Sequence, residues 1–419
     1  MSRDYGNTEK RLAQLLSKFP GLKHGIKKIY QKINYYIYSK KYKHLTELII
    51  NEYNFENKET FFGYYDHSPL NPKQTHILFH ASTLSTKKLP DPDYPIDIVL
   101  FSLKDNTAIK IAESSAYNWQ QGSRLQWIND EEFIFNSFNK QNDSYQGNIV
   151  NINAPHKTQT IKYPVYDVRE NIALSLNFDR LNLLRPDYGY RNNPLLSPDQ
   201  LNDATDGIFY LNLENNTKKL LFSIESLKRI DPVPEFNKAL HKVNHIMLAP
   251  NGDHFIFMHR WIINGRRFDR LLLSNINGTD IRIIGSGIVS HCCWINDNKI
   301  MGYFTHQNSQ PHFHLVTITN EAHSIETPGI LKNMGDGHPN CINNRIVFDT
   351  YPDKSRMKSL FVYDLNKENI DKIGEFYESM RYYDQTRCDL HPRFGLQENR
   401  IFIDSVHTGL RKLYSLVYE

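Results

Sequence analysis

Histidine recurs in this chain at one position within a series of similar segments. Five segments carry it just ahead of a polar turn and a hydrophobic stretch, as in VNHIML, SHCCW and GDGHPN. The five are His67, His245, His291, His338 and His391, while two further segments have Arg124 and Leu174 at that position. Imidazole can take up a proton near neutral pH and is a common metal ligand. If these segments meet in space, the chain has the side chains for a metal site with a general base beside it.

The same internal order of elements recurs after each of these positions. Each such segment is followed by a second strand, an irregular stretch and a third strand such as 97–103, and six of the seven units add a short fourth strand such as 218–224. This recurrence indicates a repeat architecture in which equivalent positions converge on one axis. Four antiparallel strands repeated radially predict an all-β fold, a seven-bladed β-propeller of four-stranded blades. We expect the propeller to span residues 51–419, after a basic amphipathic helical segment at 1–50.

The last unit lacks a fourth strand of its own, because the chain reaches Glu419 directly after the third. The stretch LIINEYNF, residues 48–55, has strand character and precedes the first unit. We therefore expect residues near 47–56 to pair with residues 411–418. This pairing would close the ring and cover an otherwise exposed strand edge.

Composition narrows the function classes. A net charge of +4 over 419 residues is too small to indicate a nucleic-acid partner. The four cysteines, Cys292, Cys293, Cys341 and Cys388, do not have the spacing of a zinc site. The sequence shows neither a signal-peptide pattern nor a long apolar run. These features favour a reducing, cytoplasmic setting with free thiols.

The N-terminal segment differs from the rest of the chain. Lysines accumulate there among aromatic residues, and no acidic residue lies between Lys10 and Glu47. Residues 23–43 can form an amphipathic helix, because isoleucines recur at helical spacing at positions 26, 29, 33 and 37. Two interpretations stay open. Residues 18–45 could lie on the anionic surface of the inner membrane, or the helix could pack on the outside of the propeller with its lysines facing water.

In a propeller, the loops that lead into the innermost strands and those between the second and third strands open on one face. Both sets are rich in cationic and aromatic side chains, and the longest is the insertion 179–200. Such groups on one face fit an anionic ligand with a ring, such as a sugar that carries a carboxylate. The candidate substrate-binding residues are Tyr65, His67, Gln121, Arg124, Tyr188, Trp261 and His391, and the candidate carboxylate-binding, catalytic arginines are Arg180 and Arg185.

The histidines also predict a chemistry. His291 and His338 stand on consecutive units, and with Asp336 they could hold a divalent metal. A metal on a uronate carboxylate would acidify the neighbouring proton, and a free imidazole such as His245 could remove it, which is β-elimination. The alternative is structural, because polar groups on inner strands often form hydrogen bonds to neighbouring blades.

The order of the units and the motifs VNHIML, SHCCW and GDGHP resemble oligogalacturonate lyases. These are seven-bladed propellers that use a histidine base, an arginine and Mn²⁺ held by histidines and a glutamine. The resemblance implies that His245 is the base and His291 the first metal ligand. It places Asn333, Asp336 and His338 where the family has Gln-x-x-His-x-His, so two of these three positions differ from the family pattern.

The motifs FFGYYDHSP, FDRLNLLRPDYGY, DGHPN and RCDLHPR also resemble propeller proteins encoded among bacterial capsule and O-antigen genes. That resemblance implies work on surface polysaccharide. Two function classes follow from the sequence. One is an enzyme that acts on uronate-containing glycan, and the other is a non-catalytic glycan-binding or assembly module. A propeller fold serves both.

Overall fold

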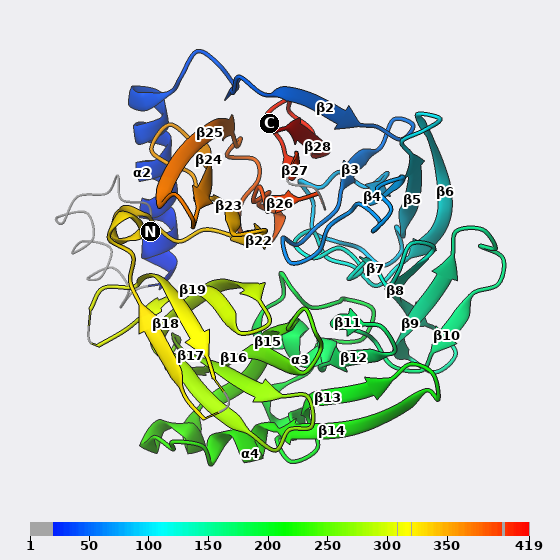
Figure 1. Cartoon of the computed structure of the whole chain (residues 1–419), viewed down its shortest axis with the longest axis vertical. Coiled ribbons are helices and arrows are strands. Elements are labelled where there is room, and N and C mark those ends of the chain that lie inside the picture. Colours follow the sequence, from blue (N-terminus) through cyan, green and yellow to red (C-terminus); the bar gives the residue numbers. More distant parts are fainter. Residues whose placement is uncertain (1–19, 308, 320, 396–398, 419) are drawn as a thin grey trace.

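The computed structural model describes residues 20–307, 309–319, 321–395 and 399–418. The described chain is mostly antiparallel β-sheet, and the sheets follow one another around a centre (Figure 1). The first three sheets contain β3 (Glu59–Phe61), β4 (His76–Ser82), β5 (Ile96–Ser102) and β6 (Thr107–Ser114); β7 (Gln126–Trp127), β8 (Glu132–Asn139), β9 (Ser144–Asn151) and β10 (Gln159–Ile161); and β11 (Asp167–Arg169), β12 (Ile172–Ser175), β13 (Gly207–Asn212) and β14 (Thr217–Ser223). Each of these sheets has four strands in consecutive order, as the sequence predicts.

The next sheet has seven strands, in the order β15 to β21. They are β15 (Leu240–Leu248), β16 (His254–Ile263), β17 (Arg266–Asn275), β18 (Ile281–Asn296), β19 (Lys299–Thr305), β20 (His312–Ile318) and β21 (His323–Glu326). The long strand β18 joins two groups, because its first part pairs with β17 and its later part with β19. Four-stranded antiparallel grouping is thus confirmed, while the count of seven blades stays a prediction.

The last two sheets draw strands from both ends of the chain. One contains β22 (Asn340–Ile342), β23 (Arg345–Asp349), β24 (Met357–Asp364) and β25 (Asn369–Tyr377), with β1 (His44–Leu45) added beside β25. The other contains β26 (Arg393–Phe394), β27 (Arg400–Ser405) and β28 (Lys412–Val417), with β2 (Ile49–Tyr53) at its edge. Strand β2 pairs antiparallel with β28, from Ile49 opposite Val417 to Tyr53 opposite Leu413. The predicted pairing of the N-terminal strand with the last unit is confirmed.

Short helices occur between the strands. They are α3 (Phe178–Leu184), α4 (Ile224–Lys228), η2 (Pro198–Gln200), η3 (Pro234–Lys238), η4 (Gly329–Asn333) and η5 (Asp384–Thr386). The hydrophobic core lies between adjacent sheets: Leu78 of β4, Phe133 of β8 and Phe402 of β27 belong to one buried cluster. Packing of sheet against sheet leaves the innermost strand ends to face the centre.

Helix α2 (Pro20–Tyr38) lies beside the sheet of β24 and β25 (Figure 1). The ring of Tyr35 makes the contact, with its centroid 5.7 Å from that of Tyr377, and the adjacent Asn34 is buried. The isoleucines face away instead, with Ile29, Ile33 and Ile37 exposed by 62%, 54% and 63%. The helix therefore packs on the sheets as one interpretation expects, but not through its apolar stripe. None of the described helices is long and apolar enough to cross a membrane.

The pairing of β2 with β28 predicts a difference between two truncations. Deleting residues 1–45 removes only the two-residue strand β1 from the sheets and should leave a folded protein. Deleting residues 1–58 also removes β2, which exposes the backbone edge of β28 and should promote aggregation. Size-exclusion chromatography with light scattering compares the two. Equal solubility of both forms would contradict the closure role of β2.

Candidate functional site

Four of the five recurring histidines meet at the centre of the sheets. The ring centroids of His291 and His338 are 4.1 Å apart, those of His338 and His391 4.5 Å, and those of His245 and His291 5.7 Å. His245 lies in β15 and His291 in β18, while His338 and His391 lie just ahead of β22 and β26. All four are at most 5% exposed. The convergence that the repeat predicts is therefore present for these four, which we call the histidine cluster.

Local backbone irregularities aim these side chains inward. The pairing register shifts between Asn244 and Met247 in β15 and between Val289 and Cys292 in β18, which places a bulge around His245 and another around His291. A β-bulge rotates side chains out of the regular alternation. His245 and His391 also have positive φ angles, 53° and 45°. A non-glycine residue in this region is held there by its surroundings, and such residues concentrate at functional sites.

Hydrogen bonds at Nδ1 orient three of the rings. His291 Nδ1 lies 3.0 Å from Asp336 Oδ1, His338 Nδ1 lies 2.8 Å from Asp349 Oδ1, and His391 Nδ1 lies 2.8 Å from the carbonyl oxygen of Gly63. Among the described residues, Nε2 of His338 and Nε2 of His391 are buried without a hydrogen-bond partner. Metal-binding histidines show this same division, with one nitrogen held by a carboxylate or carbonyl and the other left for the ion.

The ligand atoms nearest to one another belong to His338, Asp389 and His391, and all lie within 4.8 Å of each other. Two imidazoles and a carboxylate suit a divalent ion such as Mn²⁺ or Zn²⁺. Because Nε2 of His338 and Nε2 of His391 have no hydrogen-bond partner among the described residues, these side chains can bind a metal ion at this place. Asp389 stays ionised, because Arg387 and Lys358 outweigh the effect of burial and hold its pKa well below the usual value.

The predicted metal ligands are only partly brought together. His291 and His338 are in contact, as expected. Asp336 instead accepts from Ser290 and holds Nδ1 of His291, so it orients a ring. Asn333 is exposed at the end of η4. The sequence placed Asp389 among the neighbours of the histidines but did not predict it as a metal ligand, and Asp349 was not predicted at all. The Asp-x-His pattern that Asp389 shares with Asp336 was a signal for the first, whereas Asp349 lies at the end of strand β23 and no pattern marked it.

His245 forms a buried pair with Tyr64, whose hydroxyl is hydrogen-bonded to Nε2 of the imidazole. Nδ1 of His245 has no partner among the described residues. Burial, together with repulsion from Arg260 and His291, keeps the pKa of His245 well below its usual value. The ring is therefore neutral near pH 7, as a general base must be. Tyr64 was not predicted, although its neighbour Tyr65 was.

Tyr65 and Tyr188 both touch the cluster. The ring of Tyr65 lies 5.4 Å from that of His338, and its hydroxyl donates to the carbonyl oxygen of Cys292 across 3.1 Å. The ring of Tyr188 lies 5.5 Å from that of His245. Both tyrosines are almost fully buried. In this structure they form the wall of the histidine cluster.

Three other predicted substrate-binding residues connect loops. Arg124 pairs with Asp66 at 2.9 Å, His67 lies 3.3 Å from Asp167, and the amide of Gln121 donates to the Tyr166 hydroxyl. The buried guanidinium of Arg124 also donates to the Tyr166 carbonyl. These contacts connect segments of neighbouring sheets, which is the structural role that the sequence left open.

Arg180 and Arg185, both in or next to α3, have different surroundings. Arg180 is buried and donates to the carboxylates of Asp206 and Asp203 and to the carbonyl oxygen of His241. Its guanidinium is occupied by these three hydrogen bonds, so it is poorly placed to bind a substrate carboxylate. Arg185 is partly exposed, lies 3.0 Å from Asp187 and extends over the ring of Tyr188. Of the two predicted arginines, Arg185 is the one placed beside the histidine cluster.

Trp261 packs against the rings of Phe236 and Phe268, at centroid distances of 4.9 Å and 5.8 Å.

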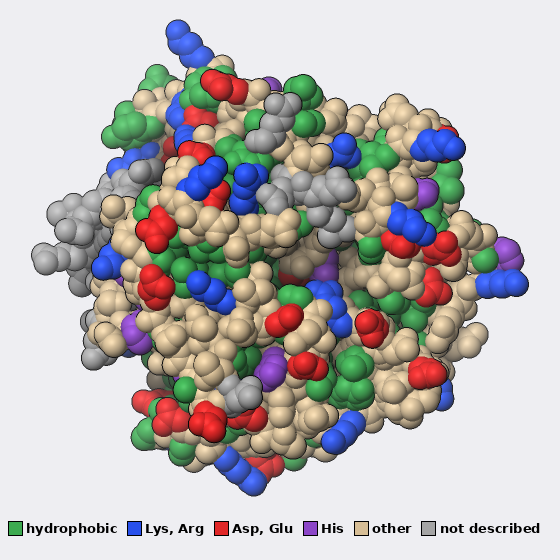
Figure 2. All heavy atoms as spheres, in the orientation of Figure 1, with side chains coloured by type: hydrophobic (Ala, Val, Ile, Leu, Met, Phe, Trp, Pro, Cys, Tyr) green, Lys and Arg blue, Asp and Glu red, His purple; other side chains and the backbone are tan. Residues whose placement is uncertain are grey.

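A cation that was not predicted, Arg387, lies nearer to the histidine cluster. Arg387 joins Asp187 to Asp389 by ion pairs of 2.8 Å and 2.7 Å. Figure 2 shows a hollow near the centre of the face in view, with histidine and acidic side chains visible inside it and a basic side chain beside it.

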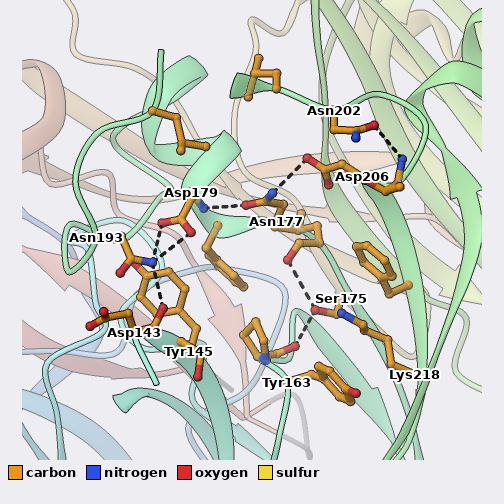
Figure 3. A pocket seen from close by; sticks show the side chains of 18 of the residues that line it. Asp143, Tyr145, Tyr163, Ser175, Asn177, Asp179, Asn193, Asn202, Asp206 and Lys218 are labelled. Atoms are coloured by element: carbon orange, nitrogen blue, oxygen red, sulfur yellow. Dashed lines mark hydrogen bonds between the residues drawn. The ribbon is translucent and has the colours of Figure 1, made fainter. Parts of the chain in front are cut away.

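A separate pocket of about 400 Å³ lies between β9, β13 and the segment around α3 (Figure 3). Asn177 caps α3, and Asn193 donates to the carboxylate of Asp179, which faces the pocket. Burial raises the pKa of Asp179 and of Asp206. The histidine cluster is not part of its lining, so this pocket and the candidate site are distinct places.

No family model and no curated protein matches this chain. Solved structures do. An oligogalacturonate lyase from Vibrio parahaemolyticus has a TM-score of 0.58 at 14% identity, over 90% of this chain and 98% of the lyase. An oligogalacturonate lyase in complex with manganese has a TM-score of 0.58 at 13% identity, over 91% of this chain and 99% of that one.

The chain folds like these lyases. A prolyl endopeptidase gives a TM-score of 0.51 at 8% identity, over 85% of this chain and 47% of the peptidase. At such identities the likeness shows the fold alone, a β-propeller, because one fold carries many unrelated activities. The predicted propeller and its resemblance to oligogalacturonate lyases are confirmed at that level.

Proposed function

We propose that this chain is a seven-bladed propeller, with β18 serving two blades, that acts on acidic, uronate-containing bacterial polysaccharide or oligosaccharide by metal-assisted β-elimination. The observation that carries the proposal is the histidine cluster. Two of its buried Nε2 atoms have no partner among the described residues, and they lie beside a neutral imidazole and a group of cations.

The metal, Mn²⁺ or a similar divalent ion, would be held by His338, His391 and Asp389, with His291 adjacent. When bound, such an ion supplies positive charge that makes the proton next to a carboxylate more acidic. Asp349 and Gly63 keep the two ligand imidazoles in orientation through their Nδ1 atoms. Rigid support of this kind fixes the ligand set before the ion arrives.

His245 removes the proton in this proposal. If Nε2 carries the ring hydrogen toward Tyr64, Nδ1 is the nitrogen that accepts. The proton leaves the carbon next to the uronate carboxyl group for Nδ1, and the electron pair of that C–H bond forms a double bond to the neighbouring carbon. The bond from that neighbouring carbon to the glycosidic oxygen breaks, and the oxygen departs with the bond's electron pair and takes a proton from water. Arg185 binds the carboxylate, since its side chain is partly exposed beside Tyr188 and close to His245.

Metal analysis and an activity assay test this proposal together. The purified protein should contain a divalent metal, and incubation with acidic oligosaccharides should raise the ultraviolet absorbance of unsaturated uronate. A protein that binds no metal and cleaves no acidic glycan with any added divalent ion would overturn it.

One observation favours the alternative, a glycan-binding or assembly module in surface-polysaccharide biosynthesis. The four histidines are at most 5% exposed, so a polymer reaches them only if neighbouring side chains move. Calorimetry distinguishes the two functions. Binding of an acidic oligosaccharide without formation of unsaturated product supports the module.

We also propose that the protein is cytoplasmic and contacts the inner membrane through residues 18–45. The exposed face of α2 carries Ile29, Ile33, Ile37 and Tyr36, and Lys32 beside them is exposed as well. The segment contains no acidic residue, which suits an anionic lipid surface.

The triple substitution Ile29→Ser, Ile33→Ser and Ile37→Ser should reduce sedimentation with phosphatidylglycerol vesicles several-fold, because apolar insertion is lost. The substitution Ile109→Ser is the control, since Ile109 is 55% exposed on β6 and the adjacent Lys110 is paired with Asp97 and Glu113. Sedimentation of the triple variant at the level of the unaltered protein, or no sedimentation of the unaltered protein, would rule out this contact.

A further inference from the structure

Two cations face each other inside the protein. Lys242 of β15 and Arg260 of β16 are directly opposite in the antiparallel pair, and they are 1% and 3% exposed. Like charges at such positions repel, because opposed side chains start about 5 Å apart. Burial removes the water that would screen them. Such a pair keeps both positive charges only where something supplies negative charge; otherwise the lysine gives up its proton.

The described protein groups supply too little of it. Four cations, Lys242, Arg260, Arg267 and Arg185, form what we call the cation cluster. Asp269 serves two of them, at 3.3 Å from Arg260 and 3.1 Å from Arg267. Asp187 lies 3.0 Å from Arg185 but is shared with Arg387. Two carboxylates therefore serve four cations, and one of the two is also used elsewhere.

Lys242 is the least compensated member. Its ammonium donates to the carbonyl oxygen of Leu184 across 2.7 Å, and no carboxylate of the described residues lies within ion-pair distance. An ammonium has three donors. Burial and repulsion by Arg260, Arg185 and Arg267 hold the pKa of Lys242 well below its usual value. An anion beside Lys242 would relieve this repulsion and accept the remaining donors.

We propose that the cation cluster is a binding site for the oxyanion group of an acidic sugar, a uronate carboxylate or a sugar phosphate. The site adjoins the candidate base, because Lys242 and His245 belong to the same strand, β15, and Arg260 and Arg185 lie close enough to His245 to repel its charged form. Only the choice of a sugar as the carrier of the oxyanion rests on the proposed function. The excess of positive charge itself follows from the contacts.

Thermal unfolding with defined anions tests the site without any activity assay. In low-salt buffer, inorganic phosphate and galacturonate are the probes, and glucose is the neutral control. At least one anion should raise the Tm of the unaltered protein in a concentration-dependent way, since a ligand that binds the folded state stabilises it. Glucose should not. A response to one anion alone identifies the oxyanion as carboxylate or phosphate.

The variant Lys242→Met should change the Tm in opposite directions for the two possible roles of this lysine. If Lys242 serves anion binding, the variant should have a higher Tm than the unaltered protein without anions, and its anion response should be at least ten-fold weaker. If Lys242 only supports the Leu184 carbonyl, the variant should lose stability and keep the anion response. Lys219→Met, on the exposed surface of β14, is the control and should change neither quantity.

Calorimetric titration of the unaltered protein with the same anions keeps the test decisive if Lys242→Met does not fold. Absence of binding to both anions would overturn the proposal. A protein that binds an anion through Lys242 but cleaves no acidic glycan retains this site and loses the proposed activity. Cleavage of an acidic glycan that is unaffected by Lys242→Met would support the proposed activity and overturn the proposed anion site.

Discussion

Replacing His245 with alanine should reduce turnover of an acidic oligosaccharide by about 10²–10⁴-fold, the usual contribution of a general base. The expectation rests on a neutral imidazole whose Nδ1 has no partner among the described residues, held beside Tyr64 and Tyr188. Affinity for the oligosaccharide should be largely retained, because the base acts mainly in the transition state. Steady-state kinetics and equilibrium binding on the same variant measure the two effects separately.

Arg185→Ala is the matched comparison. A carboxylate-binding group acts on the bound substrate as well as on the transition state, so this variant should lose affinity and rate together. Tyr64→Phe keeps the ring against His245 and removes only the hydroxyl. Full activity of His245→Ala on a substrate that the unaltered protein cleaves would assign the base to another residue.

Replacing His338 with alanine should abolish most of the bound divalent metal. His338 is central among the ligand candidates, since its ring contacts both His291 and His391 and its Nε2 has no partner among the described residues. Elemental analysis measures the loss, and circular dichroism checks that the sheets persist. Asp349→Asn should weaken metal binding by about 10–100-fold, as loss of a group that orients a ligand usually does.

His67→Ala provides the control for metal content. His67 has the same position in its repeat as His338 but lies beside Asp167 rather than in the histidine cluster. Its replacement should leave metal content unchanged. Retention of full metal content by His338→Ala would place the ion elsewhere, and equal losses in both variants would indicate a general effect on folding.

The repeat in the sequence is enough to predict a propeller-like fold of four-stranded antiparallel sheets. Regular placement of strands, turns and histidines predicts a propeller, the pairing of β2 with β28 and the convergence of five histidines. Four of the five, His245, His291, His338 and His391, meet at the centre, and His67 does not. These features depend on local strand patterns and on the need to cover a sheet edge, both of which are properties of the order of residues.

The identity of the working side chains depends on contacts between distant parts of the chain. Asp389 enters the metal site and Asp349 orients His338, while Asp336 and Arg180 are directed to other partners. Bulges and positive φ angles rotate individual residues out of the strand alternation, so their direction cannot be counted from spacing.

Contacts between distant parts of the chain also explain two findings outside the histidine cluster that the sequence did not predict. One interpretation of the stripe on α2 expected the helix to pack on the propeller, and the helix does so through Tyr35 against Tyr377, while Ile29, Ile33 and Ile37 are exposed. Lys242 and Arg260 are unremarkable cations in the sequence, and only strand pairing makes them buried neighbours. Sequence alone thus predicted the central position of four of the five recurring histidines. The place of His67, and the balance of charge and hydrogen bonds at the centre, were decided by tertiary packing, because it brings groups from different sheets within a few ångströms.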